Sequence, residues 1–306
     1  MNAAEFLARL GVSEEPVPDP SASRFPDGAH FRIEVPSVEG PRVLSAVVQA
    51  GSDLGVTVNR VSQGSGAMLL SERELAEMAR IGADNGLEVS LFVGPREEWD
   101  IGHQSRAAGG GALAGRLRGT RQLHHAVQDI LRAVEQGIRG FLIADTGLLE
   151  LVNAMQADGD IPESVVWKVS VVLAPSNPVT LLQLERFGAS TVNVPSDVTL
   201  AQLAELRSVS SIPIDLYVEA PDALGGVVRG NEIADLVSVA SPMYVKFGLR
   251  NSPSIYPSGE HLIGQAVAMA QEKVHRAGVA LEWLRRDGRD LTQSQPGAKG
   301  LGVPEP

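Results

Sequence analysis

The sequence predicts an α/β protein, a (β/α)8 TIM barrel with a short N-terminal extension and a flexible C-terminal tail. Short runs rich in β-branched residues recur between residues 31 and 250, each is followed by a stretch with helical periodicity, and the two kinds of segment alternate throughout. An open doubly wound sheet is the alternative. Its dinucleotide-binding form is disfavoured, because no G-x-G-x-x-G lies between a strand and a helix.

The predicted strands are short and rich in Val, Ile, Thr and aromatic residues, the composition that favours a pleated, half-buried surface. They are residues 31–37, 56–62, 87–94, 140–146, 165–174, 190–196, 213–220 and 243–250.

The predicted helices carry start and stop signals as well as periodicity. The first begins with Pro41 and ends at Gly55, and the second begins with Ser71 and Glu74 in the spacing of a capping box. The helices are residues 41–55, 71–86, 120–137, 148–157, 179–188, 199–209, 231–240 and 258–286.

This pattern divides the chain into three parts. Residues 1–29 are predicted to form a short amphipathic helix and a Pro/Ser/Asp-rich linker, and residues 30–288 form the barrel. Residues 289–306 have the composition of a disordered tail.

Composition excludes several classes of function. The 306 residues carry a net charge of −11, which disfavours nucleic acid and anionic membranes as partners. The absence of cysteine excludes disulfides, thiolate metal sites and a cysteine nucleophile. The N-terminus is acidic and lacks the apolar region of a signal peptide, and no apolar run is long enough to span a membrane. We therefore expect a cytoplasmic protein.

The last strand contains two cations that point to a polar barrel interior. Helices must cover one face of each strand, so the apolar Met243, Val245 and Phe247 are expected outside and Lys246 and Arg250 inside. In the second strand either Asn59 or Arg60 points inward. The same alternation places these side chains inside: Arg32, Glu34, Ser90, Asp145, Lys168, Ser170, Thr191, Asn193, Asp215, Tyr217, Glu219 and Tyr244.

Such an interior is unusual, because TIM barrels are normally filled by Val, Ile and Leu. One interpretation is a stiffening ion-pair network, for example Asp215 with Lys168 or Lys246. The interpretation that we favour is a site for a small anionic substrate at the C-terminal ends of the strands, where active sites of this fold lie.

Loops beyond the strands supply further candidates. The loop over residues 95–119 is long and rich in arginine and glycine, which predicts either a lid over an anionic substrate or a disordered insertion. The candidate substrate-binding residues are Arg60, Gln63, Ser65, Arg96, Gln104, Arg106, Asn193, Arg250 and Asn251.

Three kinds of chemistry fit these residues. In a lyase or aldolase-type enzyme, Lys246 or Lys168 forms a Schiff base while Glu34, Glu219 or Asp145 moves protons. In a metal-dependent enzyme, the same carboxylates bind Mg²⁺ or Mn²⁺; otherwise no cofactor is expected. The third alternative is a non-catalytic binder of a small molecule. The sequence leaves open whether the protein forms a homo-oligomer.

Four segments resemble a known group. FRIEVPSVEGP (31–41), RVSQGSGAMLL (60–70), LFVGPREEWDIG (91–102) and YVKFGLRNSPSIYPSGEHL (244–262) are similar to bacterial TIM-barrel proteins labelled U32-peptidase-like. The resemblance extends over most of residues 31–270 and implies a TIM barrel, with peptidase or hydrolase activity as an alternative function. Better-known members of the wider group carry cysteine clusters for Fe–S centres, which this chain lacks.

Overall fold

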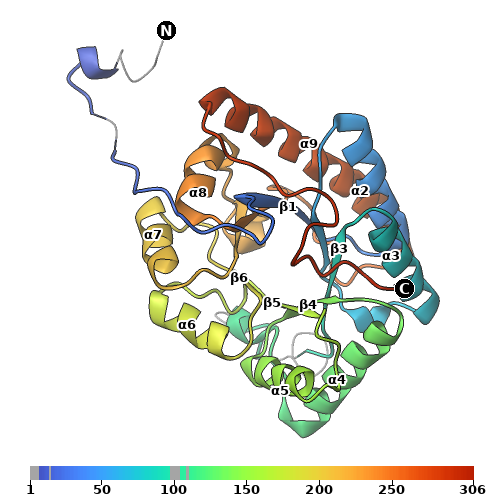
Figure 1. Cartoon of the computed structure of the whole chain (residues 1–306). Helices are drawn as coiled ribbons and strands as arrows, with labels where there is room; N and C mark the ends of the chain where they lie inside the picture. The colour runs from blue at the N-terminus through green and yellow to red at the C-terminus, as the bar shows by residue number, and fades with distance from the viewer. Residues whose placement is uncertain (1–6, 14, 97–103, 108–109) are drawn as a thin grey trace.

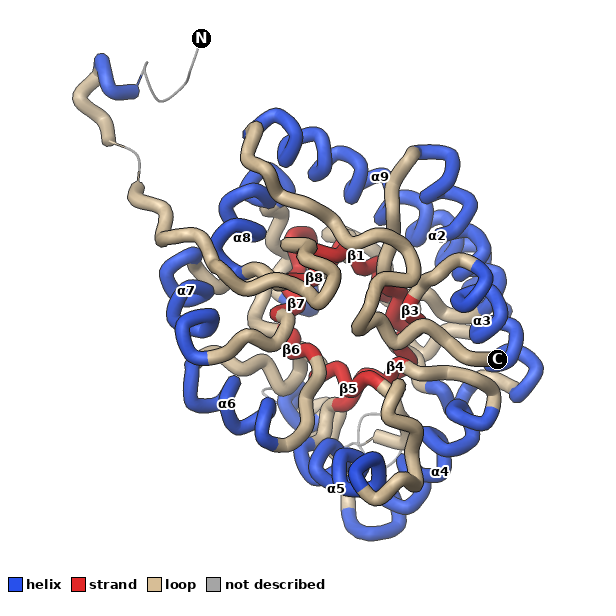
Figure 2. Tube along the Cα trace, viewed as in Figure 1, coloured by secondary structure: helices blue, strands red, loops and turns tan. Residues whose placement is uncertain are grey.

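The computed structural model describes residues 7–13, 15–96, 104–107 and 110–306. Within these residues, eight parallel strands pair in chain order from β1 to β8 and close into a barrel, and helices form a ring outside it (Figures 1 and 2). The predicted (β/α)8 TIM barrel is therefore confirmed.

The strands are three to six residues long. They are β1 (Phe31–Pro36), β2 (Arg60–Gln63), β3 (Glu88–Phe92), β4 (Gly140–Ile143), β5 (Val166–Val169), β6 (Thr191–Asn193), β7 (Ile214–Glu219) and β8 (Met243–Phe247).

An α-helix follows each strand of the barrel. These helices are α2 (Pro41–Leu54), α3 (Glu72–Asp84), α4 (Gly119–Glu135), α5 (Thr146–Ala157), α6 (Pro178–Arg186), α7 (Leu200–Val209), α8 (Ile233–Ala240) and α9 (Ile263–Asp287). None of these described helices combines the length and apolar character needed to cross a membrane.

Local side-chain chemistry explains where the helices begin. Ser71 and Glu74 form the predicted capping box of α3, and Thr199 with Gln202 forms another at α7. Pro41 occupies the first turn of α2, where its missing N–H costs no hydrogen bond.

Several strands are shorter than predicted, and at two of them turn hydrogen bonds occupy the predicted ends. Val56 N donates to Gly51 O at 2.9 Å, so Val56 closes the end of α2, and β2 begins only at Arg60. Beyond β5, Leu173 N donates to Ser170 O at 3.0 Å, which turns the chain at the barrel rim.

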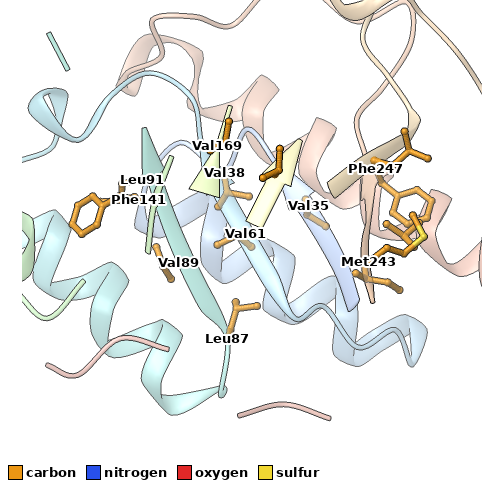
Figure 3. Packing of buried hydrophobic residues seen from close by; sticks show 14 of the residues in the cluster. Val35, Val38, Val61, Leu87, Val89, Leu91, Phe141, Val169, Met243 and Phe247 are labelled. Carbon is orange, nitrogen blue, oxygen red and sulfur yellow. The ribbon is translucent and has the colours of Figure 1, made fainter. Parts of the chain in front are cut away.

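The main hydrophobic core lies between the strands and the surrounding helices. Val35, Val61, Val89 and Val169 are fully buried on the outer face of the barrel, together with Met243 of β8 (Figure 3). Burying a side chain of this size stabilises the fold by roughly 1.5–3 kcal/mol. Because these residues alternate along the strands with polar ones, the polar side chains point into the barrel.

The C-terminal segment contradicts the predicted disordered tail. It runs across the N-terminal end of the barrel, red in Figure 1, and its Ser294 is buried. Arg32 donates to Ser294 Oγ at 2.9 Å and to Lys299 O at 2.7 Å, and Gly302 N donates to Glu88 Oε2 at 3.1 Å. The segment is ordered because the buried charges of Arg32 and Glu88 need polar partners, which its backbone supplies.

The segment before β1 covers the same end of the barrel (Figure 2). Ser21 N donates to Ser238 O at 2.8 Å, and the Phe25 ring packs edge-on against Tyr244, 5.4 Å between centroids. Both segments close the barrel at the end opposite to the C-terminal mouth.

Candidate functional site

A buried ion-pair network fills the barrel interior, centred on Glu34 of β1. The strand register places Glu34 directly opposite Arg60 on one side and Lys246 on the other. Arg60 Nη2 lies 2.5 Å from Glu34 Oε2 and 2.5 Å from Asp215 Oδ2. Lys168 Nζ forms an ion pair with Glu34 Oε1 and lies 3.7 Å from Asp215 Oδ2.

Lys246 lies at the top of this network. Its Nζ is 3.4 Å from Glu34 Oε1, donates to Asn193 Oδ1 at 2.5 Å and lies 4.2 Å from the centroid of the Tyr217 ring. Lys246 therefore shares a carboxylate oxygen with Lys168, which is entirely buried beneath it.

The charges of the network hold Glu34 ionised. Burial by itself raises the pKa of Glu34, but the neighbouring Arg60, Lys168 and Lys246 together hold that pKa well below its usual value. Burial likewise opposes the charge of Arg60, and Asp215, Glu34 and Glu88 outweigh it and raise the pKa of Arg60. Glu34 and Arg60 therefore form a permanent ion pair.

Lys168 differs from both. Burial lowers the pKa of Lys168 to about 7, and the positive charges of Arg60 and Lys246 act in the same direction against Glu34. A buried amine that exchanges its proton near neutral pH is suited to acid–base work.

This shift makes folding stability depend on pH. Between about pH 7 and 10 the unfolded chain keeps Lys168 protonated while the folded protein releases the proton, so the free energy of unfolding rises with pH, by up to about 1.4 kcal/mol per pH unit for one proton. We expect K168M to show a shallower rise in urea denaturation from about pH 7 to 9. Equal slopes in the two proteins contradict the shifted pKa.

A cavity of about 470 Å³ opens above the network, at the C-terminal ends of the strands. Lys246, Asn193, Ser62 and Ser170 line its polar floor. Ser62 Oγ donates to Glu34 Oε1 at 2.6 Å, which connects the floor to the network below. The cavity lies where active sites of this fold are found.

Several of the predicted site residues come together here. Lys246, Asn193, Gln63 and Arg96 line the cavity, and Lys168, Glu34 and Arg60 lie in the network beneath it. Of the two alternatives in the second strand, Arg60 points inward. Asn59 instead accepts from Ile33 N through its side chain at 2.9 Å.

Ser65 and Arg96 support the rim of the cavity. Ser65 is buried and its Oγ accepts from Ser258 N at 2.7 Å, which fastens the loop after β8 to the loop after β2. Arg96 donates to Gly64 O at 2.7 Å, and its guanidinium carbon lies 4.0 Å from the centroid of the Phe92 ring.

Two predicted inward carboxylates lie elsewhere, and the expectation for them is corrected. Asp145 comes after the end of β4 and caps α5, accepting from Leu148 N at 3.0 Å. Glu219 follows a register irregularity in β7, and its Oε2 lies 3.7 Å from Arg276 Nε of α9. The simple alternation of faces does not hold at either position.

The predicted binding residues beyond the strands are mostly exposed. Arg250, expected inside the barrel, is exposed and its Nε lies 3.5 Å from Asp222 Oδ1, while Asn251 donates to the same carboxylate through its backbone. Gln104 and Arg106 are exposed as well. The predicted lid lies partly outside the described residues, at 97–103 and 108–109.

Two of the buried charged residues that the sequence analysis does not predict lie in or beside the candidate site. Glu88 is buried inside the barrel near Arg60, at 3.6 Å, and it has the same strand phase as Ser90, which was recognised as inward. Lys273 of α9 lines the cavity and donates to Pro36 O at 2.8 Å. Burial lowers the pKa of Lys273 to about 8, against the opposing charge of Glu39.

The carboxylates suggested as metal ligands do not converge. Glu34 is engaged by Arg60 and Lys168, Asp145 by the backbone of α5, and Glu219 by Arg276. Among the described residues, no group of three His, Asp or Glu side chains has the geometry to hold a metal ion.

Comparisons with known proteins give likenesses of structure alone. No protein-family model matches the chain, and no curated protein matches it. A solved U32 peptidase is similar at 14% identity, covering 78% of this chain and 98% of its own, with a TM-score of 0.41. A 2,3-dimethylmalate lyase of the PEP mutase/isocitrate lyase superfamily is similar at 12% identity, covering 85% of this chain and 84% of its own, with a TM-score of 0.46.

A further similar structure is the carboxyl transferase domain of Rhizobium etli pyruvate carboxylase, at 10% identity, covering 92% of this chain and 56% of that one, with a TM-score of 0.48. The group that the sequence resembles, U32, is thus represented among the similar structures. The assignment of the fold rests on the closed, all-parallel barrel of the chain itself.

Proposed function

We propose that the protein is a lyase of the aldolase type that acts on a small carbonyl compound carrying a carboxylate or phosphate, through a Schiff base on Lys246. The observation that carries the proposal is the position of this lysine. Its side chain is only 3% exposed, it lines the cavity, and it shares Glu34 Oε1 with Lys168.

The use of lysine along the chain supports the proposal. The sequence has four lysines, all in the described residues, and Lys168, Lys246 and Lys273 are buried. Lysine is almost never fully buried unless it is paired, because removing its charge from water is costly. Two of the buried lysines, Lys246 and Lys273, line the cavity.

The reaction begins with transfer of a proton from Lys246 to the neutral amine of Lys168, both of which contact Glu34 Oε1. The free amine of Lys246 attacks the substrate carbonyl carbon and water leaves, which gives an iminium. The bond between the α and β carbons, counted from the iminium carbon, then breaks, and its electron pair forms the double bond of an enamine. In a β-hydroxy substrate the hydroxyl proton goes to water and an aldehyde leaves. Protonation of the enamine carbon and hydrolysis of the iminium release the second product and restore Lys246.

The other residues have distinct roles in this scheme. Glu34 stays ionised and stabilises positive charge on Lys246, because its pKa is held well below the usual value by its cationic neighbours. Asn193 orients the amine through its 2.5 Å hydrogen bond. The Tyr217 ring covers one side of the amine, and burial raises the pKa of the phenol so that it remains neutral.

Borohydride reduction tests the proposal directly. The protein is incubated with candidate 2-oxo acids and oxo-phosphates, reduced with sodium borohydride and mapped by peptide mass spectrometry. We expect a stable adduct on Lys246 in the wild type and none at that position in K246M.

The chain contains its own controls for this experiment. Lys299 is exposed, so an adduct confined to Lys299 or to the α-amino group reports random labelling and contradicts the proposal. An adduct on Lys273 overturns the choice of nucleophile. In K168M we expect the adduct on Lys246 to form about 100-fold more slowly near pH 7, since a general base contributes 10²–10⁴-fold. Binding without any adduct indicates a non-catalytic binder.

A further inference from the structure

The cavity above Lys246 is not polar throughout, because two of its sides carry apolar side chains. On one side Phe92, Leu142 and Val172 form an apolar cluster inside the barrel, separate from the main core between strands and helices. Phe92 and Leu142 line the cavity and are 8% and 9% exposed. These residues therefore offer an apolar surface to a ligand in the cavity.

The opposite side of the cavity is apolar too. Leu224, Leu249 and Ile255 line it, together with the ring of Tyr256. The Tyr256 hydroxyl is engaged with Ser37 Oγ at 2.5 Å, so the ring, and not the hydroxyl, remains available to a ligand.

The volume of the cavity is larger than a minimal oxo acid requires. About 470 Å³ is within the range of roughly 300–1,000 Å³ typical of sites for drug-sized ligands. A ligand whose polar end lies on the floor must extend upward between the two apolar sides to fill this space.

We infer that the substrate is an amphipathic acid, with its carbonyl and carboxylate or phosphate at one end and an aliphatic or aromatic group of several carbons at the other. The polar end lies on Lys246, Asn193 and Ser170, and the apolar group lies between Phe92, Leu142 and Val172 and the residues opposite. The inference rests on the proposed function in one respect, the choice of Lys246 as partner of the polar end.

The dependence of affinity on the length of the ligand's carbon chain tests the inference. Straight-chain 2-oxo acids from pyruvate to 2-oxodecanoate are titrated into the full-length protein by calorimetry, below the concentrations at which they form micelles. Burial of one CH₂ gives about 0.8 kcal/mol, so we expect the Kd to fall about fourfold per added carbon until the cavity is filled, and then to level off.

Two variants locate the apolar contact. V172S and L142S are expected to reduce the gain per carbon while leaving the affinity for pyruvate within about twofold. Val172 is only partly buried, so V172S is expected to fold and still tests the inference if L142S fails to fold. A Kd that does not change along the series overturns the inference, and so does an undiminished gain per carbon in folded V172S.

The test also separates this inference from the proposed function. In K246M we expect weaker binding of every acid but the same gain per carbon. A normal chain-length series without any borohydride adduct rejects the Schiff base alone. A specific adduct on Lys246 with a flat series rejects the amphipathic substrate alone.

Discussion

Replacing Glu34 with glutamine is expected to lower the free energy of unfolding by about 3–5 kcal/mol, the usual cost of removing one partner from a buried ion pair. Glu34 contacts Arg60, Lys168 and Lys246 with no exposure to solvent. Glutamine keeps the shape and some of the hydrogen bonds, but it leaves those buried cations with less negative charge. Urea denaturation near neutral pH measures the effect, with an unchanged m-value as the check that the unfolding transition is comparable.

An exposed ion pair provides the matched control. Asp84 and Arg80 form a pair one helical turn apart on α3, with both side chains about 60% exposed, and D84N is expected to cost less than about 0.5 kcal/mol. The stabilising effect of Glu34 is present above the pKa of the unfolded carboxyl and is lost as the pH falls through the lowered folded pKa, so E34Q flattens the acid limb of the stability profile. A loss below about 1 kcal/mol in E34Q contradicts the central place of Glu34 in the network.

The fold and the centre of the site could be predicted because a strand has a period of two. In β8, Met243, Val245 and Phe247 pack under the helices, so Lys246 between them points inward. The same reasoning places Glu34 and Lys168 inside the barrel. No knowledge of the partners is needed, since the apolar residues on the outer face determine the orientation of the polar ones.

The predictions were wrong where this period no longer applies. Asp145 and Arg250 lie beyond the last paired residues of β4 and β8, and Glu219 follows a register irregularity, so alternation carries no information about their side chains. Helix caps and loop carboxylates determine those positions instead. The end of a strand depends on turn hydrogen bonds that the sequence specifies only weakly.

The burial of Lys273 could have been predicted from the sequence. Lys273 follows Ala266 and Ala270 and precedes Ala277 on the stripe of α9 that packs against the barrel. A lysine at such a position must find a polar partner inside the protein, and Lys273 reaches Pro36 O at the rim of the cavity. A charged residue on an apolar helix stripe therefore indicates a buried polar site as strongly as a charged residue within a strand does.

The buried lysines and the polar floor follow from one arrangement. Glu34 lies in close contact with Arg60 and Lys168, whereas the contact of Lys246 with Glu34 is longer, at 3.4 Å. The network thus holds most of its charges in fixed pairs and presents its least tightly paired cation to the cavity.

Deleting residues 292–306 is expected to lower the free energy of unfolding by at least about 3 kcal/mol, because buried polar groups then lose their partners at about 1–3 kcal/mol each. Arg32 loses Ser294 Oγ and Lys299 O, and Glu88 loses Gly302 N. Asn59 also loses Ser294 O, to which its side chain donates at 2.9 Å. Thermal and urea denaturation of the truncated chain measure the loss.

The deletion distinguishes the disordered tail that the composition predicts from the packed segment that the structure shows. A disordered tail can be removed at no cost in stability, whereas a packed segment cannot. E305Q is the control: Glu305 is 58% exposed in its pair with Arg139, so loss of its charge is expected to cost less than about 1 kcal/mol. An unchanged denaturation curve after the deletion shows that Arg32 and Glu88 find other partners at the closed end of the barrel. A large loss assigns the last residues of the chain to the barrel itself, where they hydrogen-bond the buried charges of Arg32 and Glu88 and cover the end opposite to the candidate site.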